Sequence, residues 1–264
     1  MTSATTTAIQ PGAMPSGRLA GAYLADVKFE LLRMLRTPGM TLPFLLMPVP
    51  VYLLFGVVIP GEAIDKEPGI ANYLFSGWCA FAVMGPALFT PGCALAVERE
   101  AGLLRLKRAL PAPTGSWLVA KTLMAAMFSV FSVASVAVAA LVVGKISLSG
   151  WQVAALASTM VLGSLPFCAI GLAVGTYASG SATPAILNMI FLPMIWLSGL
   201  FFPLPAFLER WVVIWPAFHL NQLAIAASGM SGFSFVPPQM AAAVLVGVTV
   251  LFGGVAIRRL ARKG

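Results

Sequence analysis

The sequence predicts an all-α polytopic membrane protein: six transmembrane helices, an N-terminal interfacial amphipathic helix, and a re-entrant segment between spans five and six. Two observations lead to this prediction. Hydrophobic residues make up 59% of the 264 residues and charged residues only 9%, with a mean hydropathy of +0.95. A soluble domain carries about 25% charged residues. The apolar residues also fall into runs of about 20, the length that crosses a bilayer core. This composition excludes both a soluble globule and a disordered chain.

The N-terminal part divides into two segments. Residues 1–15 are rich in Thr, Ala and Pro and are expected to be disordered. Residues 16–37 predict a helix with Ser16 as N-cap and Pro38-Gly39 as the stop signal. Because apolar and charged residues occupy different faces, we expect this helix to lie in the membrane interface; the alternative is an amphipathic helix docked on protein. The apolar face holds Leu19, Tyr23, Val27, Leu31 and Leu35, and the charged face Asp26, Glu30 and Arg33.

Six spans follow, within a membrane domain that covers 16–264. They are predicted at 41–60, 70–97, 119–143, 151–177, 183–203 and 237–257. The second is expected to be broken at Gly85-Pro86 and Pro91-Gly92. Prolines inside spans are tolerated because neighbouring helices re-satisfy the freed carbonyls.

Residues 204–236 are too polar for a span and too apolar for a solvated loop, and they include Trp211, Trp215, Pro216 and His219. Backbone of this kind is tolerated at membrane depth where protein covers it. We predict a re-entrant pair of short helices on the outer face. The alternative is an aromatic-rich interfacial loop.

The basic residues predict the topology. Four Lys and Arg residues precede span one, five lie between spans two and three, and four follow span six, which leaves Lys66, Lys145 and Arg210 for the other side. Cytoplasmic loops carry the excess of basic residues, so both termini are predicted to be cytoplasmic, in a bacterial cytoplasmic (inner) membrane. The first apolar run starts too far from Met1 for a cleaved signal peptide.

Nothing in the sequence indicates catalysis by this chain. Gly144-Lys145 lacks the upstream Gly and the following Ser or Thr of a phosphate-binding loop, so ATP hydrolysis is not expected. His219 is the single histidine, and no Gly-x-Ser-x-Gly motif accompanies it. We therefore predict that the chain is not an enzyme, has no catalytic residue and holds neither a metal nor a cofactor. The three cysteines, Cys79, Cys93 and Cys168, lie in apolar runs and are expected to serve packing.

The spans themselves carry almost no charge, with Asn188 as their most polar candidate. Ion-coupled transporters usually carry ionisable residues there, so this absence weighs against a self-sufficient secondary transporter or channel. An intramembrane enzyme or assembly factor is a further alternative, for which only His219 and Glu209 would qualify. Gly171 and Gly175 form a GxxxG pattern in span four, and Gly253-Gly254 lie in span six. These glycines indicate close helix approach, either between two chains or within one.

The loop 98–117 is the most informative segment. Leucines alternate there with Arg105, Lys107 and Arg108, until Pro111 and Pro113 end the pattern. A short helix of this composition would suit a cleft in a cytoplasmic partner; the alternative is a basic loop on anionic lipid. We also expect Glu98 to pair with an arginine, because a carboxylate at a helix C-terminus is unfavourable by itself.

Two groups of residues together resemble the pattern of one protein family. The first is Glu98-Arg99-Glu100, Gly102, Arg105-Leu106 and Pro111, in the order of the family's cytoplasmic loop, with Leu103 where the family commonly has Thr. The second is Ser198-Gly199, Phe201-Phe202-Pro203, Pro205, Pro216 and His219, which is similar to the family's SG…FFP…P signature. The family is that of the ABC-2 type transporter permeases, and the resemblance covers about 16–262.

The resemblance implies the permease subunit of an ATP-driven exporter. Two permease chains, expected to be a homodimer, would associate with two ATP-binding subunits that hold ATP and Mg. Nucleic acid is not expected as a partner. The residues it assigns to coupling with the ATP-binding subunit are Glu98, Arg99, Glu100, Gly102, Leu104, Arg105 and Leu106. Those assigned to the path or dimer interface are Asn188, Leu192, Trp196, Ser198, Gly199 and Phe202, and those of the re-entrant segment are Pro203, Pro205, Pro216 and His219. Spans one and five are expected to line the dimer interface and the path. The short outer loops and aromatic residues favour an amphipathic, drug-, lipid- or glycan-like substrate.

Overall fold

The computed structural model describes residues 16–36, 42, 46–61, 68–109, 115–143, 146–201 and 208–263. Within these ranges the chain is helical apart from turns and short connections, which confirms the predicted all-α class. The elements are α1 (Ser16–Arg36), α3 (Pro48–Tyr52) with the π-helix η1 (Leu53–Val58), α5 (Pro68–Glu100), α6 (Leu103–Ala109), α7 (Ser116–Val143), α8 (Gly150–Tyr177), α9 (Thr183–Trp196), α10 (Glu209–Val212), α11 (Pro216–Ala227), the 3-10 helix η2 (Ser231–Phe233) and α12 (Pro238–Lys263). The predicted disordered segment 1–15 lies outside the described residues.

Four helices of the described chain are long and apolar enough to cross a membrane: Gly69–Glu100, Ser116–Val143, Gly150–Tyr177 and Pro238–Arg262. They coincide with the predicted spans two, three, four and six. Two shorter apolar helices, Pro48–Val58 and Thr183–Trp196, occupy the places of spans one and five. Helix α9 thus ends before the predicted limit at 203, and part of the predicted first span lies outside the described residues.

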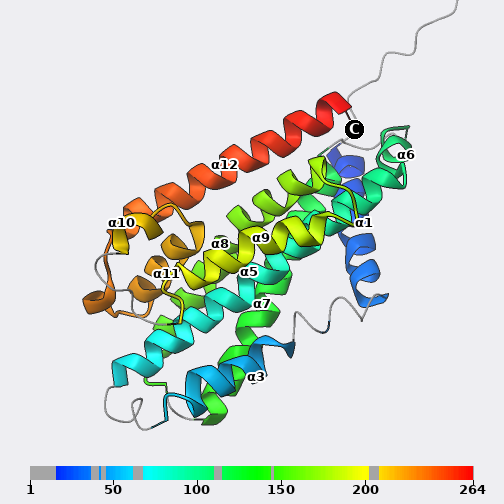
Figure 1. The fold of residues 1–264 in the computed structure, drawn as a ribbon. Coiled ribbons are helices and arrows are strands. Elements are labelled where there is room, and N and C mark those ends of the chain that lie inside the picture. The colour runs from blue at the N-terminus through cyan, green and yellow to red at the C-terminus, as the bar shows by residue number, and fades with distance from the viewer. Residues whose placement is uncertain are drawn as a thin grey trace, which may run out of the picture.

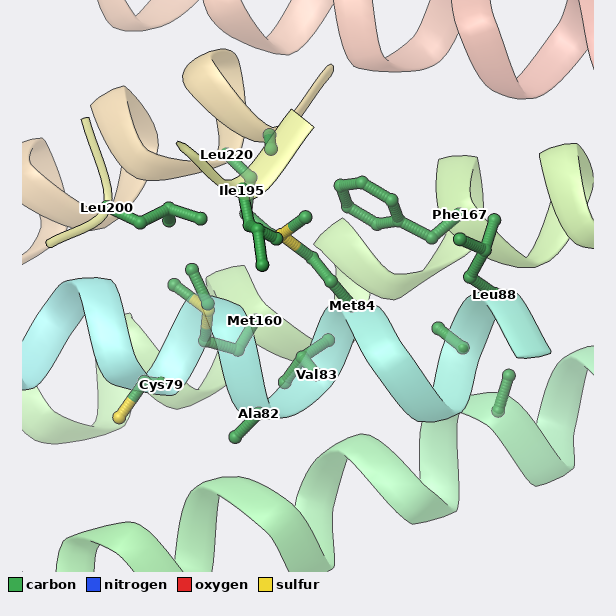
Figure 2. Packing of buried hydrophobic residues seen from close by; sticks show 14 of the residues in the cluster. Cys79, Ala82, Val83, Met84, Leu88, Met160, Phe167, Ile195, Leu200 and Leu220 are labelled. Carbon is green, nitrogen blue, oxygen red and sulfur yellow. The ribbon is translucent and has the colours of Figure 1, made fainter. Parts of the chain in front are cut away.

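Helix α5 is the centre of the bundle. It packs against α7, α8, α9 and α11, as Figure 1 shows for the cyan helix. Figure 2 shows Val83, Met84 and Leu88 of α5 among buried residues of the surrounding elements, with Phe167 of α8 and Ile195 of α9 close by. The predicted break of span two is wrong: α5 continues through Pro86 and Pro91 without interruption. Packing on several sides holds the helix together where the prolines remove backbone donors.

Glycines set the distance between α5 and α8. A Cβ at Gly171 would overlap the carbonyl oxygen of Leu88, and one at Gly92 would lie 2.7 Å from the oxygen of Gly171. A Cβ at Gly175 would in turn overlap the oxygen of Gly92. The GxxxG pattern of span four therefore serves helix packing within the chain. This is one of the two interpretations that the sequence left open, the other being packing between two chains. Gly253 and Gly254 of α12 have open space at their Cβ positions.

Helix α1 confirms the helix predicted at 16–37, and it docks on α7. Its half-buried side combines apolar residues such as Tyr23 and Val27 with the charged Asp26 and Glu30. Leu24, Phe29 and Leu35 are exposed. The charged residues that the sequence placed on a separate face thus point toward protein, and apolar side chains remain outside.

The basic segments that are far apart in the sequence gather at one end of the bundle. Figure 1 shows α1, α6 and the C-terminal end of α12 at that end. A cation–π contact places the Arg259 guanidinium 4.6 Å from the ring centroid of Tyr177, at the end of α8. We call the end of the bundle that holds α1, α6 and the C-terminal end of α12 the basic end, and the opposite end of α5 the far end.

Candidate coupling site at the basic end

A tight turn joins α5 to the short helix α6. Helix α5 ends at Glu100, and Gly102 adopts a φ of +71°, which residues with a Cβ rarely adopt. The amide of Gly102 donates to the carbonyl of Arg99 (3.2 Å), and its own carbonyl accepts from the amide of Arg105 (3.0 Å). The turn at Gly102 takes up only residues 101–102, so α6 follows α5 with almost no linker.

Helix α6 has one anchored side and one exposed side. Leu104 is buried at 4% exposure, whereas Leu106 is 63% and Leu103 43% exposed. Arg105 is exposed as well. This part of the predicted loop 98–117 therefore offers apolar and basic side chains to the outside while Leu104 holds it to the bundle. Residues 110–114, with Pro111 and Pro113, lie outside the described residues.

Glu98 lies in a buried ionic cluster that joins three helices. Its carboxylate accepts from Lys121 Nζ of α7 at 2.8 Å and pairs with Arg33 of α1. The Lys121 ammonium also lies 2.7 Å from Glu30 Oε1 of α1. The prediction that Glu98 pairs with an arginine is confirmed, although that arginine comes from α1 and Lys121 contacts the same carboxylate oxygen. We call Glu30, Arg33, Glu98 and Lys121 the ionic cluster.

Arg99 joins α5 to the connection between α8 and α9. Its guanidinium donates to the carbonyl of Thr176 and, at 2.6 Å, to that of Ala178. The carbonyls at the end of α8 have no partner within the helix, and a cation there is favourable. Glu100 lies against Gly180, because a Cβ at that glycine would be 2.8 Å from Glu100 Oε2.

The seven residues predicted for coupling lie close together in the chain but differ in their contacts. Glu98, Arg99, Glu100, Gly102 and Leu104 attach or orient α6 and the end of α5, whereas Arg105 and Leu106 face outward. The sequence did not identify which residues surround Glu98.

Arg33 and Lys121 pair with Glu98, and Lys121 also pairs with Glu30. A second link joins Ser116 of α7 to Asp26 of α1. The spacing of Asp26, Glu30 and Arg33 on one face of 16–37 was the signal that could have found them. The sequence could not show that this face meets α5 and α7.

The residues predicted for the path or dimer interface separate into an outer and an inner group. Asn188, Leu192 and Trp196 are exposed along α9, with Leu192 at 51% and Trp196 at 65% exposure. Ser198 and Gly199 are buried beneath the end of the helix. Phe202 lies outside the described residues.

Two short helices, α10 and α11, occupy the predicted re-entrant segment. Pro216 begins α11, a position where its missing amide costs nothing. His219 is buried, and its Nε2 lies 2.8 Å from the carbonyl oxygen of Val213. Pro203 and Pro205 lie outside the described residues.

Comparison with known proteins agrees with the architecture. The family described as "ABC-2 type transporter" matches residues 22–235. A protein of Bacillus subtilis (strain 168) named "Putative transport permease YvfS" is 26% identical over 174 residues, which cover 66% of this chain and 71% of that protein. The residues that match the family include the ionic cluster, α6, α9 and the α10–α11 segment. This chain therefore belongs to the ABC-2 type transporter family and is a membrane permease of that family.

Proposed function

We propose that this chain is the membrane-spanning subunit of an ATP-driven exporter, in which a separate subunit binds and hydrolyses ATP with Mg. The observation that carries the proposal is α6. It exposes Arg105 and Leu106 at the basic end, is anchored by Leu104, and follows directly on the central helix α5. An exposed helix with basic and apolar side chains suits a cleft on an ATP-binding subunit, which membership of this family implies.

The contacts around α6 support transmission of movement to the spans. A displacement of α6 reaches α5 through the Gly102 turn. From α5 it reaches α1 and α7 through Glu98, and the α8–α9 connection through Arg99. Because these links are charged and largely buried, they hold defined geometries and would move as one unit. In this proposal Arg105 and Leu106 contact the ATP-binding subunit, and Glu98, Arg99, Glu100, Gly102 and Leu104 pass the movement on.

We further propose six spans with both termini in the cytoplasm of a bacterial cell. The gathering of α1, α6 and the end of α12 at one end supports a single basic, cytoplasmic side. Helix α9, with 14 residues, is about 21 Å long. This is less than the roughly 30 Å of a hydrocarbon core, so its span needs the segment that follows.

The exposed face of α9 supports a homodimer with the path at or near that face. Asn188, Met189, Leu192 and Trp196 lie there, and Met189 is 76% exposed. One amide among apolar and aromatic side chains suits an amphipathic, drug-, lipid- or glycan-like substrate.

Disulfide cross-linking tests the pairing. Single cysteines replacing Leu192 or Trp196 should give a dimer in membranes, whereas one replacing the fully buried Leu187 should not. Failure of every exposed α9 position to cross-link would argue against this interface.

Charge reversal on α6 tests the function. The full chain is purified with its ATP-binding subunit. Vanadate-sensitive, substrate-stimulated ATPase activity and transport are measured in vesicles, over a panel of hydrophobic compounds and glycolipids. Arg105→Glu should uncouple ATPase from transport or release the subunit while expression persists. Arg258→Glu is the matched control, because it reverses an exposed arginine near the same end but away from α6. Unchanged coupling in Arg105→Glu would remove the role of α6. Transport driven by an ion gradient without ATP would instead support a secondary transporter.

A further inference from the structure

At the far end, the chain that leaves α9 carries a backbone carbonyl group that accepts two side-chain hydrogen bonds. The hydroxyl of Tyr73, on α5, donates to the carbonyl oxygen of Gly199, and the side-chain amide of Asn221, on α11, donates to the same oxygen at 2.7 Å. Tyr73, Gly199 and Asn221 are all buried. Gly199 has a φ of +65°, so a residue with a Cβ would be strained at this position.

The next two residues continue the contact with α5. A Cβ at Gly77 would overlap the carbonyl oxygen of Leu200, so the glycine allows the two backbones to touch. The ring of Phe201 lies 4.4 Å, centroid to centroid, from that of Trp78. Residues 199–201 thus lie in order against one side of α5, and the register between α5 and the end of α9 is set over three consecutive residues.

Helix α11 is attached to α5 independently of α9. The hydroxyl groups of Ser76 and Ser228 lie 2.8 Å apart, and Gln152 of α8 donates to the carbonyl of Ser228 at 3.0 Å. The two donors to the Gly199 carbonyl therefore come from helices that are already joined, and their shared acceptor links the end of α9 to both of them.

At the basic end, Arg99 and Glu100 of α5 hold the connection that leads into α9. Helix α5, with 33 residues, is about 50 Å long and so contacts both ends of the shorter α9. We infer that Tyr73 and Asn221 are positioning residues that fasten the far end of α9 to α5 and α11 through the Gly199 carbonyl, so that α9 follows the movement of α5. The role in transport rests on the proposed function; the attachment itself does not.

Hydrogen exchange on the purified permease in nanodiscs tests the attachment without any partner. Tyr73→Phe and Asn221→Leu each remove one donor and keep the size of the side chain. We expect amide exchange over 194–201 to accelerate about fivefold in each variant, the effect of losing one net hydrogen bond. Asn72→Leu is the matched control, because Asn72 is the neighbour of Tyr73 but bonds Ser147 at 3.1 Å. It should accelerate exchange near 147 and leave 194–201 unchanged. Unchanged exchange over 194–201 in both test variants, or equal acceleration throughout the bundle, would overturn the attachment.

Labelling in the complex with the ATP-binding subunit tests the role in transport. A cysteine replacing Leu197, which is 39% exposed, is labelled with a maleimide in the nucleotide-free and the vanadate-trapped complex; the three native cysteines are buried. We expect the nucleotide-dependent change in labelling rate to be lost in Tyr73→Phe/Asn221→Leu, while ATPase stays within twofold of the parent and Asn72→Leu keeps the change. A change that persists in the double variant would overturn the role. A parent complex that shows no nucleotide response would count against the proposed function, and the exchange result would still decide the attachment.

Discussion

Removal of Lys121 should be the most damaging single change to the ionic cluster. Its side chain is 2% exposed and lies 2.7 Å from Glu30 Oε1 and 2.8 Å from Glu98 Oε1, which are themselves on side chains 12% and 6% exposed. Lys121→Met leaves two largely buried carboxylates with Arg33 as the remaining cation of the cluster, and that arginine is 43% exposed. Breaking a buried pair costs about 3–5 kcal/mol. Since Arg33 stays in place, we expect about 3 kcal/mol of lost stability.

A double-mutant cycle tests this estimate. The free energy of unfolding is measured in mixed detergent micelles for Lys121→Met, Glu98→Gln and the double variant. The double variant should be less destabilised than the sum of the singles, by about 1–3 kcal/mol, because the second change removes the carboxylate charge that Lys121 no longer balances. Lys28→Met is the control, since Lys28 is exposed on α1, and should change stability by less than about 0.5 kcal/mol. Additive single effects, or a Lys121→Met variant as stable as the parent, would show that the cluster does not hold α1 to α5 and α7.

Two further predictions concern the packing and the basic end. Gly171→Ala should lower stability by about 2 kcal/mol, because the new Cβ meets the rigid backbone of Leu88. Gly253→Ala, where the Cβ position is open, should be neutral or slightly stabilising. Thermal melting followed by size-exclusion chromatography compares the two variants, and equal melting temperatures would contradict the close contact. Arg99→Leu should accelerate hydrogen exchange over 176–182 by at least tenfold, because hydrogen bonds from a charged donor contribute about 1.5–3 kcal/mol. Arg99→Lys should restore part of the protection. Exchange equal to that of the parent in both variants would show that Arg99 does not link α5 to the α8–α9 connection.

Helix existence followed from the sequence, but helix continuity and length did not. The apolar runs located α5, α7, α8 and α12 because burial in lipid or protein demands apolar side chains over a fixed length. The prolines of 70–97 wrongly predicted a break, since the contacts that keep α5 continuous come from helices distant in the sequence. Helix α9 shows the reverse: its apolar run continues to 203, yet the helix ends at Trp196 and the chain turns at Gly199 to meet Tyr73 and Asn221.

The candidate site divides in the same way. The short charged segment after span two, its glycine and its leucine–arginine pattern were visible in the sequence, because a turn and a short helix depend on residues next to one another. The pairing of Glu98 with Arg33 and Lys121 joins residues 65 and 23 positions apart. A separation of this size has no local signature.

By itself, the sequence determined that this protein lies in a membrane, where its helices fall and which segment carries the basic charge, since composition and periodicity are properties of neighbouring residues. Only the tertiary structure decided that Glu98 and Arg99 hold helices together while Arg105 and Leu106 face outward. A carboxylate at the end of a helix has the same sequence whether it points to a partner protein or into the bundle. The cations that surround it in space determine which of these roles it has.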